Sequence, residues 1–340
     1  MVRFGSVRVD GQVERDPGRR ISAGSRVFVL WSPQAAATQP SPRLVFHDDH
    51  LWIVWKPAGI PVQGTRLGTG NSVEDYLAQT SRKGREPRIV HRLDLPVSGL
   101  MVAAATAEGA AGLSKGFEDG AVRKVYLAVV QVGSSQCAPL LERLRQGGAI
   151  ELDQPLLWVS GRQRALVSAD GKPARSRVAL VSELGTCGET SCGNRPSPQA
   201  LTGGLALLAI RLLSGRTHQI RVHLSHAGMP VVGDVSYGAP AAEPATSDLS
   251  HSRTPSPAAG SPLRTPAPTG AADGGDVVVA EPRRIALHST FLAFPHPLGK
   301  GPVVFQELPP DDFWRCAGAG TPADLLNRFR EILPVVGCGD

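Results

Sequence analysis

The amino-acid sequence predicts an α+β fold, in which strands and helices alternate without forming a regular βαβ series. Strand-like runs rich in apolar and β-branched residues occur at 51–55, 100–104, 125–130 and 205–213. Between them lie two short stretches with helical patterning, 72–80 and 106–120. With 340 residues, of which 41% are hydrophobic, the chain is long enough to bury a substantial core.

The first segment of the chain predicts a small group of short strands. Apolar residues alternate with polar ones over 6–30, around a turn at Asp10 and Gly11, and Gly24 precedes a second alternating run. Residues 33–43 are rich in Pro, Ala and Ser and predict a linker. The chain is therefore expected to comprise a hairpin-like segment over 1–32, a linker, and a larger body.

The body is expected to span 44–315 and to be interrupted twice. Residues 182–204 and 239–282 are rich in Pro, Gly, Ser, Thr and Ala and poor in aromatic residues. Such segments bury too little apolar surface to order themselves, and strand-like sequence resumes after each of them. We therefore expect two flexible insertions within one domain, followed by a C-terminal tail over 316–340.

Charge and cysteine content restrict the functional class. The formal net charge is +6, and most of the basic residues are arginine, which suits bidentate contacts with phosphate. The first residues lack the apolar core of a signal peptide, and no run approaches the roughly 18 apolar residues of a membrane span. Five cysteines do not suggest a disulfide framework. These features predict a cytoplasmic protein with a polyanionic partner, or an organellar one if the true N-terminus is longer.

One sequence motif indicates a specific catalytic site. Residues 91–102, HRLDLPVSGLMV, place a single carboxylate, Asp94, in a basic and turn-rich setting. The motif resembles that of the RluA-type pseudouridine synthases, usually written HRLD, two variable residues, then TSGL. Further blocks resemble the same family in the same order, namely 47–64, 123–130, 214–238 and the closing run ALHSTFLAFPHP. Together they cover the body apart from the two insertions.

The resemblance implies isomerisation of a uridine within an RNA chain, without a cofactor or a metal. The N-glycosidic bond breaks, the uracil turns within the pocket, and it is rejoined to the ribose through C5. The target base must be flipped out of the RNA to be reached, into a pocket that also retains the detached uracil. The implied fold is a mixed, mainly antiparallel sheet with flanking helices and an active site in a basic cleft.

Three residues match the catalytic positions of the family. Asp94 would act as the nucleophile, either by attacking the ribose or by assisting its deprotonation, and Arg221 would supply the cation that keeps it ionised. Tyr126 would pack against the uracil and assist proton transfer at C5. Without the resemblance, Asp94 could equally be a turn or ion-pair residue and Tyr126 an ordinary strand aromatic.

Basic and polar residues near these positions are expected to bind RNA. His91 and Arg92 precede the nucleophile, and Arg92 would help to fill the place of the flipped base; a phosphate contact is the alternative for both. A solvated charged face is the alternative for the basic run that precedes them. The full set of expected RNA contacts is Arg82, Lys83, Arg85, Arg88, His91, Arg92, Arg216, His218 and Gln219.

The sequence departs from the family pattern at two places. Val97 stands where threonine is usual, so a hydrogen bond that helps to set the catalytic loop is expected to be missing. The N-terminal segment resembles only the second half of an α-L RNA-binding module. Either Met1 is not the true start, or a remnant has been retained as a structural hairpin.

Other functional classes fit the sequence less well. Residues 112–116, GLSKG, fit the serine-hydrolase pattern but fall in a helix-like stretch. A metal held by His218, His223 and His226 is disfavoured because His218 lies in a strand-like run and no carboxylate or cysteine recurs at ligand spacing. A glycosidase would need a second carboxylate opposite the first, and we expect no acidic partner in the other motif blocks. The principal rival is an RNA-binding or chaperone-like protein that retains the fold without turnover.

The target RNA is left open by the sequence. Members of the family act on ribosomal RNA, transfer RNA or both, and the choice depends on loops and on RNA shape. A monomer is the default expectation for the oligomeric state.

Overall fold

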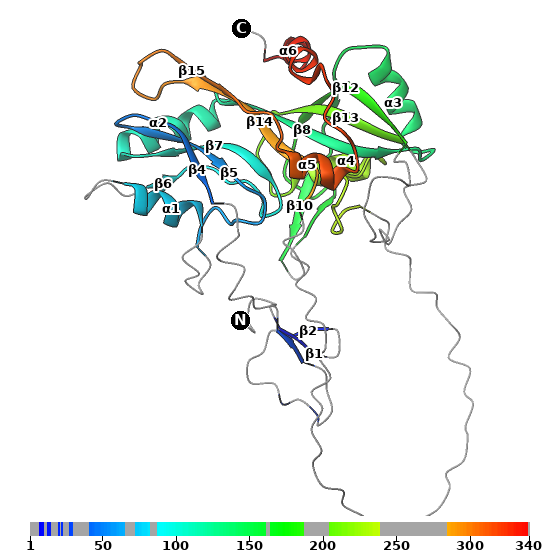
Figure 1. The fold of residues 1–340 in the computed structure, drawn as a ribbon, viewed down its shortest axis with the longest axis horizontal. Coiled ribbons are helices and arrows are strands. Elements are labelled where there is room, and N and C mark those ends of the chain that lie inside the picture. Colours follow the sequence, from blue (N-terminus) through cyan, green and yellow to red (C-terminus); the bar gives the residue numbers. More distant parts are fainter. Residues whose placement is uncertain are drawn as a thin grey trace, which may run out of the picture. The chain divides into compact units, whose positions relative to one another are not determined.

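The fold is known from a computed structural model of the chain (Figure 1). The structure describes residues 7–9, 12–14, 20, 22, 27–29, 41–64, 72–81, 87–160, 164–186, 204–238 and 284–338. The predicted insertion at 239–282 lies outside the described residues. None of the described helices has the length and apolar character needed to cross a membrane.

The N-terminal segment contains a small sheet of its own, formed by three antiparallel strands in the order β2-β1-β3. These strands are β1 (Val7–Val9), β2 (Gln12–Glu14) and β3 (Val27–Val29). The alternating sequence predicted short strands here, and they are present. Binding of RNA by this segment stays a prediction.

The body is built on one ten-stranded sheet, in which eight strands run in the order β4-β5-β7-β14-β8-β13-β12-β9. Two further strands extend it, because β15 pairs with β14 and β6 pairs with β7. All pairings are antiparallel except that of β7 with β14, so the sheet is mixed and mainly antiparallel, as predicted. The strands are β4 (Arg43–His47), β5 (Leu51–Lys56), β6 (Arg88–Ile89), β7 (Ser98–Ala104), β8 (Arg123–Val132), β9 (Ile150–Leu152), β12 (Ser176–Thr186), β13 (Gly204–Leu212), β14 (Leu287–Pro295) and β15 (Pro302–Gln306).

In the described part of the chain, six helices and a separate hairpin accompany this sheet. The hairpin pairs β10 (Leu156–Val159) with β11 (Arg164–Val167). The helices are α1 (Val73–Thr80), α2 (Ala107–Glu118), α3 (Ala138–Arg145), α4 (Gln219–His226), α5 (Asp311–Ala317) and α6 (Leu325–Val335). The two predicted helices are confirmed as α1 and α2, and both start where the sequence provides an N-cap. Ser72 forms a capping box with Asp75, and Thr106 accepts a hydrogen bond from the Gly109 amide.

The parallel pairing of β7 and β14 depends on a glycine. Ser98 and Gly99 on β7 lie opposite His288 and Ser289 on β14. Gly99 has a φ of 120°, and a Cβ atom added there would lie 2.3 Å from the Ser289 carbonyl oxygen. Only glycine combines this backbone conformation with such a close approach. The Ser98 hydroxyl is 2.7 Å from His288 Nδ1 and links the same two strands.

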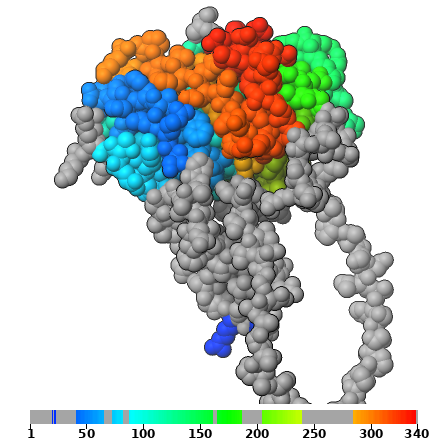
Figure 2. Space-filling model, in the orientation of Figure 1, coloured from blue at the N-terminus to red at the C-terminus, as the bar shows by residue number. Residues whose placement is uncertain are grey.

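Two expected boundaries are wrong. Residues 182–186 belong to β12, and Gly204 begins β13. Regular strands therefore extend into both ends of the insertion predicted at 182–204. Its residues 187–203 lie outside the described part of the chain. The C-terminal tail predicted over 316–340 is largely helical: α5 ends at Ala317, and α6 packs on β12 with Phe329 fully buried. Figure 2 shows these helices (red) against the β14–β15 region (orange).

Candidate active site

The loop between β6 and β7 carries Asp94, and backbone contacts hold it in place. The Val97 amide donates to the Asp94 carbonyl oxygen at 3.1 Å, and the Gly59 amide donates to the Leu95 carbonyl oxygen at 2.8 Å. Val97 is itself buried in the main apolar core, with 2% of its surface exposed. The loop is therefore anchored by its main chain and by an apolar side chain, at the position where the family usually has threonine.

Lys56, at the end of β5, also holds the loop that carries Asp94. Its side chain is fully buried at the end of β5, and its Nζ donates to the carbonyl oxygens of Pro57 (2.9 Å), Ile60 (2.7 Å) and Leu95 (3.2 Å). Three acceptors match the three hydrogens of an ammonium group. Burial lowers the pKa of Lys56 to about 7, and the negative charge of Asp94 opposes that shift. This lysine thus ties the turn after β5 to the loop that bears Asp94.

A buried arginine joins Asp94 to a second carboxylate. Arg221 on α4 donates from Nη1 to Asp94 at 3.1 Å, and from Nε and Nη2 to Asp234 at 2.6 and 2.9 Å. The side chains of Arg221 and Asp234 are 6% and 2% exposed, whereas that of Asp94 is 24% exposed. Because Asp234 fixes the guanidinium bidentately, Arg221 presents its remaining edge to Asp94. The structure thereby brings together the predicted nucleophile and its predicted cation.

His218 approaches the same carboxylate from another direction. Its Nε2 lies 3.8 Å from Asp94 Oδ2, and its Nδ1 lies 2.8 Å from the Tyr237 hydroxyl, which accepts from the Ala165 amide. Burial lowers the pKa of His218, against the effect of Asp94, so the neutral form is favoured. If the Tyr237 hydroxyl donates to Nδ1, the ring hydrogen sits on Nε2 and points toward Asp94.

The backbone of His218 is unusual. Among the described residues it is the one non-glycine residue with a positive φ, 58°, and it lies immediately before α4. The expectation that it lies within a strand is wrong. Residues held in the left-handed region cost free energy and cluster at functional sites.

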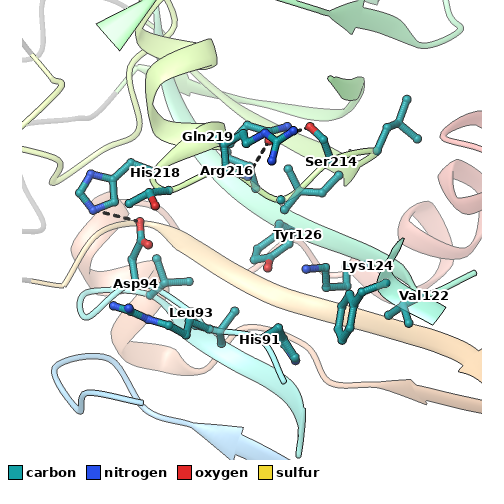
Figure 3. Close-up of a pocket in the computed structure, with 18 of the residues that line it drawn as sticks. His91, Leu93, Asp94, Val122, Lys124, Tyr126, Ser214, Arg216, His218 and Gln219 are labelled. Carbon is teal, nitrogen blue, oxygen red and sulfur yellow. Dashed lines mark hydrogen bonds and ion pairs between the residues drawn. The ribbon is translucent and has the colours of Figure 1, made fainter. Parts of the chain in front are cut away.

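A pocket of about 900 Å³ opens over these groups (Figure 3). Asp94, Tyr126, His218 and Arg221 all line it. Tyr126 is 5% exposed on β8, and burial together with the charge of Asp94 raises its pKa. Its phenol is consequently neutral at physiological pH, and it can offer a ring face and a hydroxyl hydrogen but not a phenolate.

The predicted RNA contacts divide into groups. Arg92 and Arg216 line the pocket and are exposed, whereas Arg88 is exposed on β6 and does not line it. Arg82, Lys83 and Arg85 lie outside the described residues. Further cations that the sequence reasoning did not single out, Lys124, Arg175, Arg177 and Arg211, also line the pocket, as do the carboxylates Asp94 and Glu118.

Two residues predicted to contact RNA line the pocket and also have partners within the protein, so their contact with RNA stays a prediction. The Gln219 side chain accepts from the Ser214 hydroxyl and the Arg216 amide and donates to the Arg175 carbonyl and the Ser176 hydroxyl, at 2.9–3.0 Å. These four bonds use its full capacity, so its geometry is that of a positioning residue.

His91 is the second of these residues. Its Nε2 accepts from the Val102 amide at 3.0 Å, and burial and the charge of Lys124 lower its pKa. Its Nδ1 is buried and has no partner among the described residues. His91 is therefore a neutral ring that holds the start of the catalytic loop to β7.

The rival functions can also be compared with the geometry. Ser114, at the centre of GLSKG, lies inside α2 and not on a strand-to-helix turn. The expectation that no second acid recurs in the motif blocks is wrong, because Asp234 belongs to the block at 214–238. However, Asp234 is buried and bound bidentately to Arg221, so it is unsuited to act as the acid of a glycosidase.

The comparisons with known proteins agree with this arrangement. Residues 50–226 match the family model described as RNA pseudouridylate synthase. The ribosomal large subunit pseudouridine synthase D of Xanthomonas campestris is 30% identical over 329 residues, which cover 94% of this chain and 82% of the relative. The protein of the same name from Nitrosomonas europaea is 31% identical over 299 residues, 85% of this chain and 66% of the relative.

A solved structure shares the fold. Human RNA Pseudouridylate Synthase Domain Containing 1 aligns with a TM-score of 0.52 at 18% identity, over 85% of this chain and 94% of that one. With the family match and the sequence relatives, the class is defined: an enzyme that modifies RNA. The chain belongs to the RNA pseudouridylate synthase family, and the predicted isomerase activity is confirmed at that level.

Proposed function

We propose that this chain converts specific uridines of ribosomal RNA to pseudouridine, with Asp94 as the nucleophile. The observation that carries the proposal is the contact of Asp94, partly exposed in the pocket, with a buried arginine that a second carboxylate holds in place. Ribosomal RNA is chosen because relatives that match 85–94% of this chain are named as synthases of the ribosomal large subunit. Transfer RNA is the alternative substrate, and a cytoplasmic monomer is the form we expect.

The residues of the pocket suit the steps of the isomerisation. Arg221 stabilises ionised Asp94, which both routes require, whether the carboxylate attacks the ribose or removes a proton from it. The Tyr126 ring offers a face for the uracil while the base turns. When the bond to C5 forms, C5 loses a proton and N1 gains one, so the product is an isomer of the substrate. Since the Tyr126 phenol is neutral, we assign it packing and hydrogen bonding in place of abstraction of the C5 proton.

We assign Arg92 a role in base flipping. It is exposed two residues before Asp94 and lines the pocket, so its guanidinium can occupy the space that the flipped uridine leaves in the RNA stack. A contact with phosphate is its alternative role.

The experiment is a pseudouridine map of total RNA from cells that carry the native gene, Asp94→Ala, or the matched control Asp119→Ala. Asp119 is an exposed acid at the end of α2 and does not line the pocket. We expect Asp94→Ala to abolish modification at one or a few sites, and the control to leave them intact. An unchanged map with normal expression of the variant protein would contradict the proposal and favour the RNA-binding rival.

A further inference from the structure

The wall of the pocket contains a largely buried lysine that has no charged partner among the described residues. Lys124 on β8 is 8% exposed, and its Nζ lies 5.0 Å from the centre of the Phe117 ring. Within the described part of the chain, no residue forms a hydrogen bond or an ion pair with this Nζ. Glu118 also lines the pocket, but no ion pair joins it to Lys124.

A buried ammonium destabilises the folded protein unless another interaction offsets the free-energy cost of its burial. Removing an ammonium from water is unfavourable, and an aromatic face offsets only part of that cost. Burial lowers the pKa of Lys124 to about 8, so the side chain is still mainly cationic at pH 7. Its positive charge is also one of the causes that lower the pKa of the buried His91. The pocket is thus lined by a largely buried lysine whose ammonium opens to the pocket and pairs with no carboxylate among the described residues.

The position of Lys124 separates it from the reacting atoms. It lies two residues before Tyr126 on the same strand, so both side chains project from one face of the sheet, with starting points ~7 Å apart. The charge of Asp94 acts on the pKa of Tyr126, whereas burial alone lowers that of Lys124. In the view of Figure 3, Tyr126 lies between Asp94 and Lys124.

We propose that Lys124 binds a phosphodiester group of the RNA strand next to the flipped uridine. The proposal rests on the proposed function, because it takes Tyr126 as the residue that packs against the uracil. A phosphodiester supplies the missing negative charge, which a neutral uracil carbonyl group would not. A compact ammonium on a flexible stem suits a single charged oxygen at the side of the base pocket.

The first measurement is the affinity of the full-length chain for a short RNA that contains the mapped target uridine, over a range of KCl concentrations. Lys124→Met removes the charge and keeps an apolar side chain over Phe117, Lys124→Arg retains the charge, and Lys115→Met is the matched control on the exposed face of α2. We expect Lys124→Met to weaken binding about tenfold at low salt and to reduce the salt slope by ~0.7, as for one lost contact with single-stranded RNA. Lys124→Arg and Lys115→Met should keep the native slope.

The second measurement locates the phosphate. Neutral methylphosphonate groups replace the linkages near the target uridine one at a time. One replacement should weaken binding by the native chain but not by Lys124→Met. A native salt slope in Lys124→Met, or equal losses in both proteins at every linkage, would overturn the proposal even if the native chain modifies the RNA. Failure of the native chain to modify this RNA would instead count against the proposed function.

Discussion

Two buried lysines of the same sheet differ in their hydrogen-bond partners. Lys56, at the end of β5, donates to three carbonyl oxygens and ties two loops together. Lys124, on β8, lies over an aromatic ring and has no acceptor among the residues that the structure describes. Burial lowers the pKa of both side chains, so burial alone does not separate their roles. The difference lies in the hydrogen bonds: a satisfied cation stabilises the architecture, whereas an unsatisfied one is free for a ligand.

The largest effect is expected at Lys56. Lys56→Met would leave the carbonyl groups of Pro57, Ile60 and Leu95 without their buried donor, and each unsatisfied buried group costs about 1–3 kcal/mol. We expect the free energy of unfolding to fall by about 3–5 kcal/mol, measured by urea denaturation at pH 7. A loss below about 1 kcal/mol would show that the three contacts do not hold the loop. Lys56 would then not be the structural lysine of this pair.

The opposite sign is expected at Lys124. Lys124→Met removes a buried charge without breaking a hydrogen bond to a described residue. In the absence of RNA, the variant protein should therefore be more stable than the native chain. The shift of the pKa from 10.5 to about 8 sets an upper limit of ~3 kcal/mol on this gain at pH 7. Urea denaturation of the same variant used for RNA binding measures it, with Lys115→Met, expected within about 0.5 kcal/mol of the native chain, as the control. Destabilisation of Lys124→Met would mean that the ammonium already has a partner.

The last effect is the pH dependence of that gain, whose full size should be lost across a defined pH window. The folded-state pKa of Lys124 lies below its unfolded value, so between about pH 8 and 10.5 the unfolded chain binds more protons at this site. The native chain should therefore recover stability relative to Lys124→Met as the pH rises through this window. The advantage of the variant should be constant below about pH 8 and vanish near pH 10.5. An advantage that does not change across the window would indicate a packing effect instead of a charge effect.

Much of the scaffold was predictable from sequence because it depends on local patterns. The apolar runs at β5, β7, β8 and β13, and the N-caps Ser72 and Thr106, act within a few residues of where they stand. Helix α6 was not predicted although its sequence carries a local signal, because Leu325, Phe329 and Leu333 recur at helical spacing and form its buried face.

The site was predictable only in part. The family motifs identified Asp94, Tyr126 and Arg221, which meet in one pocket. They did not reveal that Asp234 holds Arg221, because that partnership joins groups that no short-range spacing rule connects. Gln219 lies beside a predicted catalytic residue, yet its amide nitrogen donates to the Arg175 carbonyl and the Ser176 hydroxyl, more than 40 residues away at the start of β12, and these two contacts had no local signal.

The central position of β14 has a consequence for synthesis of the protein. The strands before it form two groups, β4-β5-β7 and β8-β13-β12-β9, and β14 joins them through β7 on one side and β8 on the other. Asp94 precedes β7, whereas Tyr126 lies on β8 of the second group and Arg221 lies on α4, which follows β13 and contacts β12. Because a ribosome makes β14 after both groups, the nascent chain carries an incomplete sheet until residue 295 has emerged. Assembly of the catalytic centre is thus a late event of translation, and a chain that ends before β14 would lack the strand that joins its two halves.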